Sequence, residues 1–185
     1  MIYKVARLGH PVIRAAAQQV APGRINTPEF QRILDDMVDT MREYSGVGLA
    51  GPQVHLGLQV AVLEVDRHPR YPDMPPVLLT FLINPVVEVI DSARIEDWEG
   101  CLSIPEMRGR VPRYKSLRVR ALGRHGEALD FVANDFHARV IQHETDHLKG
   151  EVYLDRMTDM RSLAHLLEWQ RYALAPRAAG DTDKE

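Results

Sequence analysis

The chain has 185 residues, of which 45% are hydrophobic and 26% are charged, and its formal net charge is −3 at pH 7. This length and composition suit one soluble globular domain, and the negative balance gives no electrostatic reason to expect nucleic-acid binding. No apolar run is long enough to cross a membrane, and the N-terminus lacks the apolar core of a secretory signal. The single cysteine, Cys101, excludes a disulfide framework. These features predict a cytoplasmic protein, with an organelle as the alternative if a targeting segment has been removed.

The first 25 residues are broken by Pro11 and Pro22, and we expect loop and short extended structure there. Thr27 and Pro28 then suit the N-cap and the first turn of a helix that ends at Gly46. The apolar residues in this stretch recur with helical spacing: Phe30, Ile33, Leu34, Met37, Val38 and Met41. We expect this N-terminal helix to pack in the core and to have no catalytic role.

The middle of the chain is rich in β-branched residues bounded by turn-forming ones, which predicts strands. The expected strands are Leu58–Val65, Val77–Ile83 and Val86–Ile90, with an exposed loop at 68–76. Two further runs flank a glycine turn and predict a hairpin: Leu117–Leu122 and Ala128–Val132.

A second helix is expected from about Asp135, as its cap, to Lys149, and an amphipathic C-terminal helix from about Asp159 to Leu174. Residues 176–185 are polar and are expected to be a disordered tail. With no repeat or linker, we predict a single catalytic domain over residues 1–175. The predicted fold class is α+β, with antiparallel β-sheets packed around the central helix and with an N-terminal and a C-terminal helix.

The run QHETDH at residues 142–147 of that central helix is the most informative motif. Its HExxH pattern places His143 and His147 one turn apart on one face, where both can bind a metal ion, with Glu144 beside them to transfer protons. The alternative is a histidine pair without a metal. The histidines share their face with Phe136 and Val140, however, and a buried pair would then need other polar partners. We favour the metal.

Cys101 lies in the segment EGCLSIP, residues 99–105. A lone cysteine is commonly a small buried residue. Gly100 and Pro105, however, give this segment a special local shape, which suits the presentation of a side chain.

Three segments, GVGLAGPQ (46–53), EGCLS (99–103) and QHETDHL (142–148), resemble in order and spacing the signature motifs of the peptide deformylases. The one departure is Gly51, where the family usually has alanine. The resemblance implies a metal-dependent hydrolase that removes the formyl group from N-formylmethionyl peptides of nascent chains and releases formate. It also implies Fe²⁺ as the cellular metal, with Zn²⁺, Ni²⁺ or Co²⁺ as substitutes, although affinity alone favours Zn²⁺ over Fe²⁺.

By this resemblance the metal ligands are Cys101, His143 and His147, and a water in the fourth position is the nucleophile. Glu144 acts as general base and then as general acid. The oxyanion is stabilised by the metal and by two further groups, the Gln53 side chain and the Leu102 backbone N–H. Without the motif, Gln53 would be interpreted as an ordinary turn residue.

The resemblance also assigns substrate contacts and supporting residues. The backbone at Val47, Gly48 and Gly100 would pair with an extended peptide. The pocket for the methionine side chain would be formed by Val47, Phe136 and Val140, which would look the same as plain core residues. Arg108 falls at the position of an arginine that contacts the substrate in the family. An equal alternative is that Arg108 is an ordinary solvated charge on a loop. A Glu99–Arg113 pair would support the cysteine segment, and Asp146 would either support a ligand histidine or cap hydrogen bonds on the helix.

Two rival functions stay open from the sequence. A zinc endopeptidase would need a third ligand downstream, where Glu168 is available, while the position of a third histidine in a related pattern is occupied by Tyr153. A structural metal protein or peptide-binding module would need neither Glu144 nor Gln53. We also expect a transient ribosome contact through the C-terminal helix, which carries Arg161 and Arg171.

Overall fold

The computed structural model describes residues 1–65 and 76–174. Nearly all of the predicted loop at 68–76 and the whole predicted tail at 176–185 lie outside the described residues. Neighbouring strands pair antiparallel in the order β1-β2-β3-β4-β5, and β6 is added to β4. The strands are β1 Gly48–Ala50, β2 Val60–Val65, β3 Val77–Cys101, β4 Ile104–Leu122, β5 Ala128–Asn134 and β6 Ala164–His165. With the helices described below, this confirms the predicted α+β fold class.

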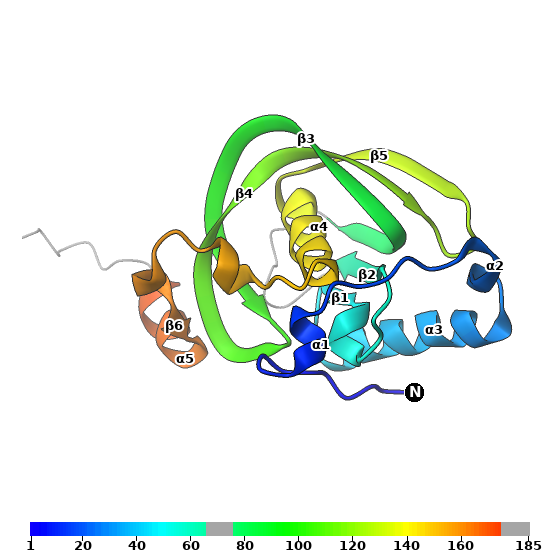
Figure 1. Cartoon of the computed structure of the whole chain (residues 1–185). Helices are drawn as coiled ribbons and strands as arrows, with labels where there is room; N and C mark the ends of the chain where they lie inside the picture. Colours follow the sequence, from blue (N-terminus) through cyan, green and yellow to red (C-terminus); the bar gives the residue numbers. More distant parts are fainter. Residues whose placement is uncertain (66–75, 175–185) are drawn as a thin grey trace, which may run out of the picture.

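The long strands β3 and β4 differ from the prediction, which placed two short strands at 77–90 and none between 91 and 116. They pair from Ile83 with Leu122 to Cys101 with Ile104, and several register shifts interrupt the ladder. Such bulges bend a sheet, and in Figure 1 the two strands curve around helix α4. No local pattern predicted this, because residues 91–97 of β3 are all exposed and carry no apolar alternation.

Helix α3, Pro28–Glu43, confirms the predicted N-terminal helix and ends three residues before Gly46. The Thr27 side chain accepts a hydrogen bond from the Phe30 backbone N–H at 3.3 Å and caps the helix. Its apolar face packs on strands β1 and β2 in a buried cluster that contains Phe30, Leu34, Met37, Val38 and Met41.

The central helix is α4, Asp135–Leu148, and it contacts strands from β1 to β5. Asp135 is the first helical residue, so its prediction as the cap is wrong by one position. The cap is Asn134, which makes no side-chain capping bond. Just past the end, Gly150 has a φ of +78°, and a Cβ there would lie 2.5 Å from the Arg14 carbonyl oxygen.

The two ends of the chain depart most from prediction. Pro11 and Pro22 do not interrupt extended structure but begin one-turn helices, α1 Pro11–Arg14 and α2 Pro22–Ile25. The C-terminal helix is shorter than predicted. It comprises α5, Leu166–Glu168, and a continuing π-helical turn, Trp169–Ala173, because the preceding residues pair with β4 as strand β6.

Further one-turn 3-10 helices occur at Gly51–Val54, Tyr153–Arg156 and Met160–Ser162. No helix in the described residues is long and apolar enough to span a membrane.

Candidate metal centre

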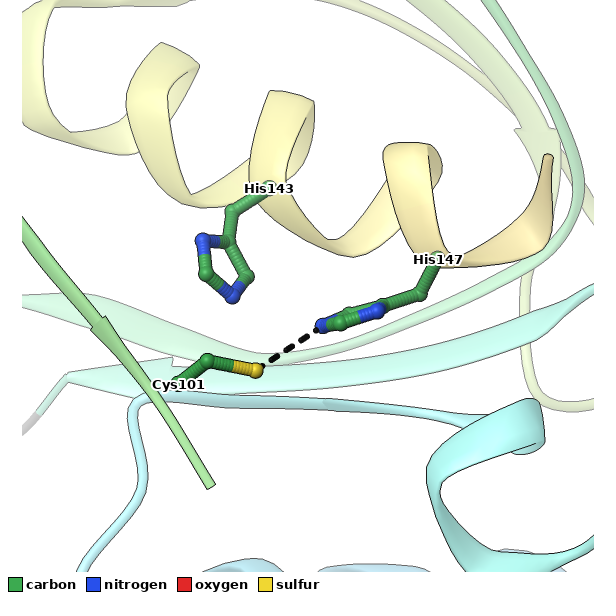
Figure 2. A group of neighbouring side chains, drawn as sticks. All are labelled: Cys101, His143 and His147. Atoms are coloured by element: carbon green, nitrogen blue, oxygen red, sulfur yellow. Dashed lines mark hydrogen bonds between the residues drawn. The ribbon is translucent and has the colours of Figure 1, made fainter. Parts of the chain in front are cut away.

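Helix α4 and the end of strand β3 together place three potential metal ligands. Figure 2 shows the rings of His143 and His147 projecting from α4 toward Cys101. The Cys101 Sγ lies 3.3 Å from the His147 Nε2, and the three ligand atoms lie within 4.8 Å of one another. In the part of the chain that the structure describes, this is the one group of three or more such side chains able to hold an ion.

The chemistry of these ligands suits a transition-metal ion. Burial disfavours ionisation of the Cys101 thiol, but the charges and hydrogen bonds of His147 and His143 outweigh it and lower the thiol pKa well below its usual value. A thiolate and two imidazoles form the mixed sulfur and nitrogen set typical of zinc and iron sites. Three protein ligands leave a coordination position open for water or substrate.

The Glu99 carboxylate connects the polar side chains behind the ligands by hydrogen bonds. Its Oε2 lies 2.9 Å from the His143 Nδ1, which fixes that ring and leaves Nε2 as the ligand atom. The Arg113 guanidinium donates two hydrogen bonds to the carboxylate, at 2.8 and 3.0 Å. Burial alone would raise the pKa of Glu99, but the hydrogen bonds from His143 and Arg113 outweigh it and lower that pKa below its usual range. Glu99 therefore stays ionised.

Asp146 joins this network from the opposite side of Arg113. Both residues are 4% exposed, and the Asp146 carboxylate accepts hydrogen bonds from Arg113 and from Arg156. The sequence left two roles open for Asp146. These contacts connect the carboxylate to His143 through Arg113 and Glu99.

Sequence reasoning missed Arg139, which is 6% exposed. Its Nη1 donates to Glu99 and to the Val111 carbonyl oxygen, each at 2.8 Å, and its Nη2 donates to the Ile95 carbonyl oxygen at 2.6 Å. It therefore clamps α4 to both long strands. The spacing of four residues between Arg139 and His143 was the available signal, but an arginine on an amphipathic helix is ordinarily solvated.

The Glu144 carboxylate is buried beside the ligands and packs against strand β1. A Cβ on Gly48 would lie 2.3 Å from the Glu144 Oε1, so this close approach requires glycine. The Glu144 Oε2 is buried without a hydrogen-bond partner among the described residues. Burial raises the pKa of Glu144 to about 7, which suits a group that exchanges protons near neutral pH.

Gln53 is 1% exposed and its side-chain amide faces the cysteine. Its Nε2 donates to the Cys101 Sγ at 3.5 Å and to the Ser103 hydroxyl at 3.3 Å, and its Oε1 accepts the Ala50 backbone N–H at 2.8 Å. The amide orientation is therefore fixed from both ends. Ser103 is a second residue that sequence reasoning missed.

A cavity of about 980 Å³ lies over this group. Its wall includes every residue predicted for substrate contact and for catalysis: Val47, Gly48, Gln53, Gly100, Leu102, Arg108, Phe136, Val140 and Glu144. Strand β1 is the terminal strand in the described sheet order, so one of its edges can accept a further strand.

The ligand set predicted for an endopeptidase does not assemble among the described residues. Glu168 is exposed on α5 and does not belong to the ligand group. Tyr153 is buried and stacks on the His143 ring, with the two ring centroids 6.2 Å apart.

Comparison with known proteins agrees with this geometry. Residues 2–162 match the family model described as polypeptide deformylase. The chain is similar to peptide deformylase 1 of Nitrosomonas europaea, with 46% identity over 89% of this chain and 93% of that protein. It is equally similar to peptide deformylase 2 of Ralstonia nicotianae, with 46% identity over 86% of this chain and 89% of that protein. Among solved structures, the Met-Ala-Ser-bound class I type b peptide deformylase of Acinetobacter baumannii matches with a TM-score of 0.80 and 34% identity, over 85% of this chain and 99% of that chain.

Proposed function

The chain belongs to the peptide deformylase family, and we propose that it removes the N-formyl group from formylmethionine at the start of nascent polypeptides, releasing formate. The observation that carries this proposal is the shared cavity floor. The Cys101 thiol, the His143 imidazole, the Glu144 carboxylate and the Gln53 amide line one cavity, and the His147 imidazole lies 3.3 Å from that thiol.

The direct test is formate release from formyl-Met peptides, together with metal analysis of protein purified without air. We expect Cys101→Ser to lose or alter metal binding and activity, because it replaces the soft sulfur ligand. Glu168→Gln is the matched control and should behave as the parent protein. Loss of activity in the control with retention in Cys101→Ser would contradict the proposal.

A divalent metal held by Cys101, His143 and His147 would lower the pKa of a bound water and polarise the formyl oxygen. Glu144 is placed to take the proton of the attacking water and to deliver it to the amine nitrogen as the carbon–nitrogen bond breaks. A pKa near neutrality supports both directions of transfer, and the buried Oε2, which has no hydrogen-bond partner in residues 1–65 and 76–174, leaves an acceptor for that proton.

We assign to the Gln53 amide and the Leu102 backbone N–H the stabilisation of the negative charge that develops on the formyl oxygen. Gln53 supports this role because its Oε1 is anchored to the Ala50 N–H, so its Nε2 points toward the reacting centre without reorganisation. Leu102 supports this role because it follows Cys101 directly in the chain and lines the same cavity.

For substrate binding, we infer that the formylated peptide adds as a strand beside β1. Val47 and Gly48 on one side and Gly100 on the other line the cavity and offer backbone groups to it. The methionine side chain would enter the apolar part of the wall formed by Val47, Phe136 and Val140.

The Glu99, Arg113 and Asp146 network has a supporting role in this proposal. Each carboxylate is held by at least two guanidinium hydrogen bonds, so the His143 ring is fixed before the metal binds. We add Arg139 to this set on the same grounds.

We further propose Fe²⁺ as the cellular metal, with Zn²⁺, Ni²⁺ or Co²⁺ able to replace it. A thiolate ligand beside Fe²⁺ is prone to oxidation, so activity should decay in air and be preserved by Ni²⁺ or by reductant. Equal stability of the iron and nickel forms in air would contradict this assignment.

The proposed setting is the bacterial-type cytosol. Residues 1–175 would act there as a single catalytic domain. The C-terminal segment would make a transient contact with the ribosome. Arg161 and Arg171 are exposed on that segment and support the contact. Salt-sensitive co-sedimentation with ribosomes, lost on truncation after Met157, is its test.

A further inference from the structure

The C-terminal segment from Ala164 to Ala173 lies beyond residue 162, where the family match ends, yet it reaches the substrate cavity. Strand β6 pairs with β4 through His165 opposite Met107 and Ala164 opposite Arg108. In Figure 1 this segment lies against the outer side of β4. Leu166, the next residue, forms part of the cavity wall together with Arg108 and Gly100.

Arg108 is the link between this segment and the proposed peptide site. It is 6% exposed, although it belongs to a charged residue type that is rarely buried. A Cβ on Gly100 would lie 1.9 Å from the Arg108 Nη1, so the guanidinium fills the space that glycine leaves open. The cation therefore lies directly against the backbone that we assign to peptide pairing.

The contacts of the guanidinium include one with its own strand and one with an aromatic ring of the C-terminal segment. Its Nη1 donates to the Met107 carbonyl oxygen at 2.8 Å, which involves only its own strand. Its centre also lies 5.6 Å from the ring of Trp169, a favourable distance for a cation–π interaction.

Trp169 is fixed in turn by a second tryptophan. The rings of Trp98 and Trp169 meet edge to face, with centroids 6.1 Å apart and an interplanar angle of 63°. Trp98 lines the cavity on β3, two residues before Gly100. The Trp169 indole N–H is buried and makes no hydrogen bond within the described residues, while its ring contacts both Trp98 and Arg108.

We propose that Trp169 is a positioning residue for Arg108 and thereby determines how much binding the enzyme gains from substrate residues after the formylmethionine. The guanidinium presents donor N–H groups and no acceptor, so it would bind peptide carbonyl oxygens of those residues. A substrate that ends at the methionine would not reach it. The inference rests on the proposed deformylase activity of the same cavity.

The test compares formyl-Met-Ala-Ser with formyl-Met amide in Trp169→Leu, which keeps an apolar side chain and removes the aromatic face. We expect kcat/KM for the longer substrate to fall about fivefold, through KM, while the short substrate is unaffected. Tyr172→Leu is the matched control, because Tyr172 is 72% exposed on the same segment and should change neither value.

A double-mutant cycle with Arg108→Gln separates positioning from general packing. If Trp169 acts through Arg108, the loss for the longer substrate in the double variant equals that in Arg108→Gln alone. Equal losses for both substrates in Trp169→Leu, or additive losses in the cycle, would overturn the inference. Absence of formate release from either substrate by the parent, metal-loaded protein would instead overturn the proposed function.

Discussion

Helices α3 and α4 have similar lengths, 16 and 14 residues, but they bury different kinds of side chain. The buried face of α3 is apolar except for Thr40. The buried face of α4 includes Arg139, Glu144, Thr145, Asp146 and His147. Apolar burial stabilises a fold directly, whereas buried charges cost desolvation energy that their partners must offset.

This difference indicates that α3 mainly stabilises the fold, whereas α4 carries the side chains of the metal centre. The side chains of α3 need only to fill volume between the helix and the sheet. The buried polar side chains of α4 need specific hydrogen-bond or ion-pair partners. Glu99, for example, binds His143 and Arg139 of this helix and also Arg113 of β4. We therefore expect substitutions in α3 to change the free energy of unfolding, and substitutions around α4 to change rate or metal affinity.

The largest effect should come from Glu144→Gln. This change keeps the size of the side chain but removes proton transfer, so kcat should fall by about 10²–10⁴-fold. Metal content should stay at the level of the parent protein, because Glu144 is not a ligand. Formate release and elemental analysis measure the two quantities, and loss of the metal together with activity would count against a purely catalytic role.

Leu34→Ala should separate α3 from the active site. Leu34 is fully buried, so its truncation should lower the free energy of unfolding by about 2–5 kcal/mol. Denaturant unfolding measures this loss. The kcat of the molecules that stay folded should be unchanged, and a fall in kcat below the melting transition would show that the two helices are more strongly coupled than we infer.

Glu99→Gln should act on the metal more than on the fold. The substitution keeps the shape but removes the charge that fixes His143, so metal affinity should fall by about 10–100-fold. Competition with a chelator gives the affinity, and Glu151→Gln is a suitable control because that side chain is only partly buried, at 39% exposure, and binds Arg156. Identical affinities in the two variants would contradict the role of Glu99.

The smallest effect should come from a pair outside both helices, Arg14 with Asp155. Burial favours a higher Asp155 pKa, but hydrogen bonds from Arg14 and the Val152 N–H outweigh it and lower the pKa. Its contribution is therefore present above the unfolded-state pKa and is lost as the pH falls through the folded-state pKa. Because both side chains are more than one-third exposed, Arg14→Met should cost below about 1 kcal/mol at pH 7. Unfolding curves at pH 7 and pH 3 test this, and a cost that grows in acid would contradict the sign.

The sequence by itself determined the features that depend on local spacing. The boundaries of α3 follow from its cap, its proline and its apolar period, all within one stretch of chain. The positions of His143 and His147 follow from helical geometry as soon as that segment is helical. Cys101, Gln53 and Leu102 were assigned through the family motifs, and the structure places them beside the same cavity.

Only the tertiary structure decided the features that depend on distant partners. Residues 91–97 form a strand because β4 pairs with them, and no apolar pattern marks them. Arg139 is buried because Glu99 and two strand carbonyl groups accept its hydrogen bonds. Trp169 meets Arg108 because β6 pairs with β4 instead of continuing as a helix. In each case the favourable energy comes from a group far away in the sequence, so no local pattern could indicate it.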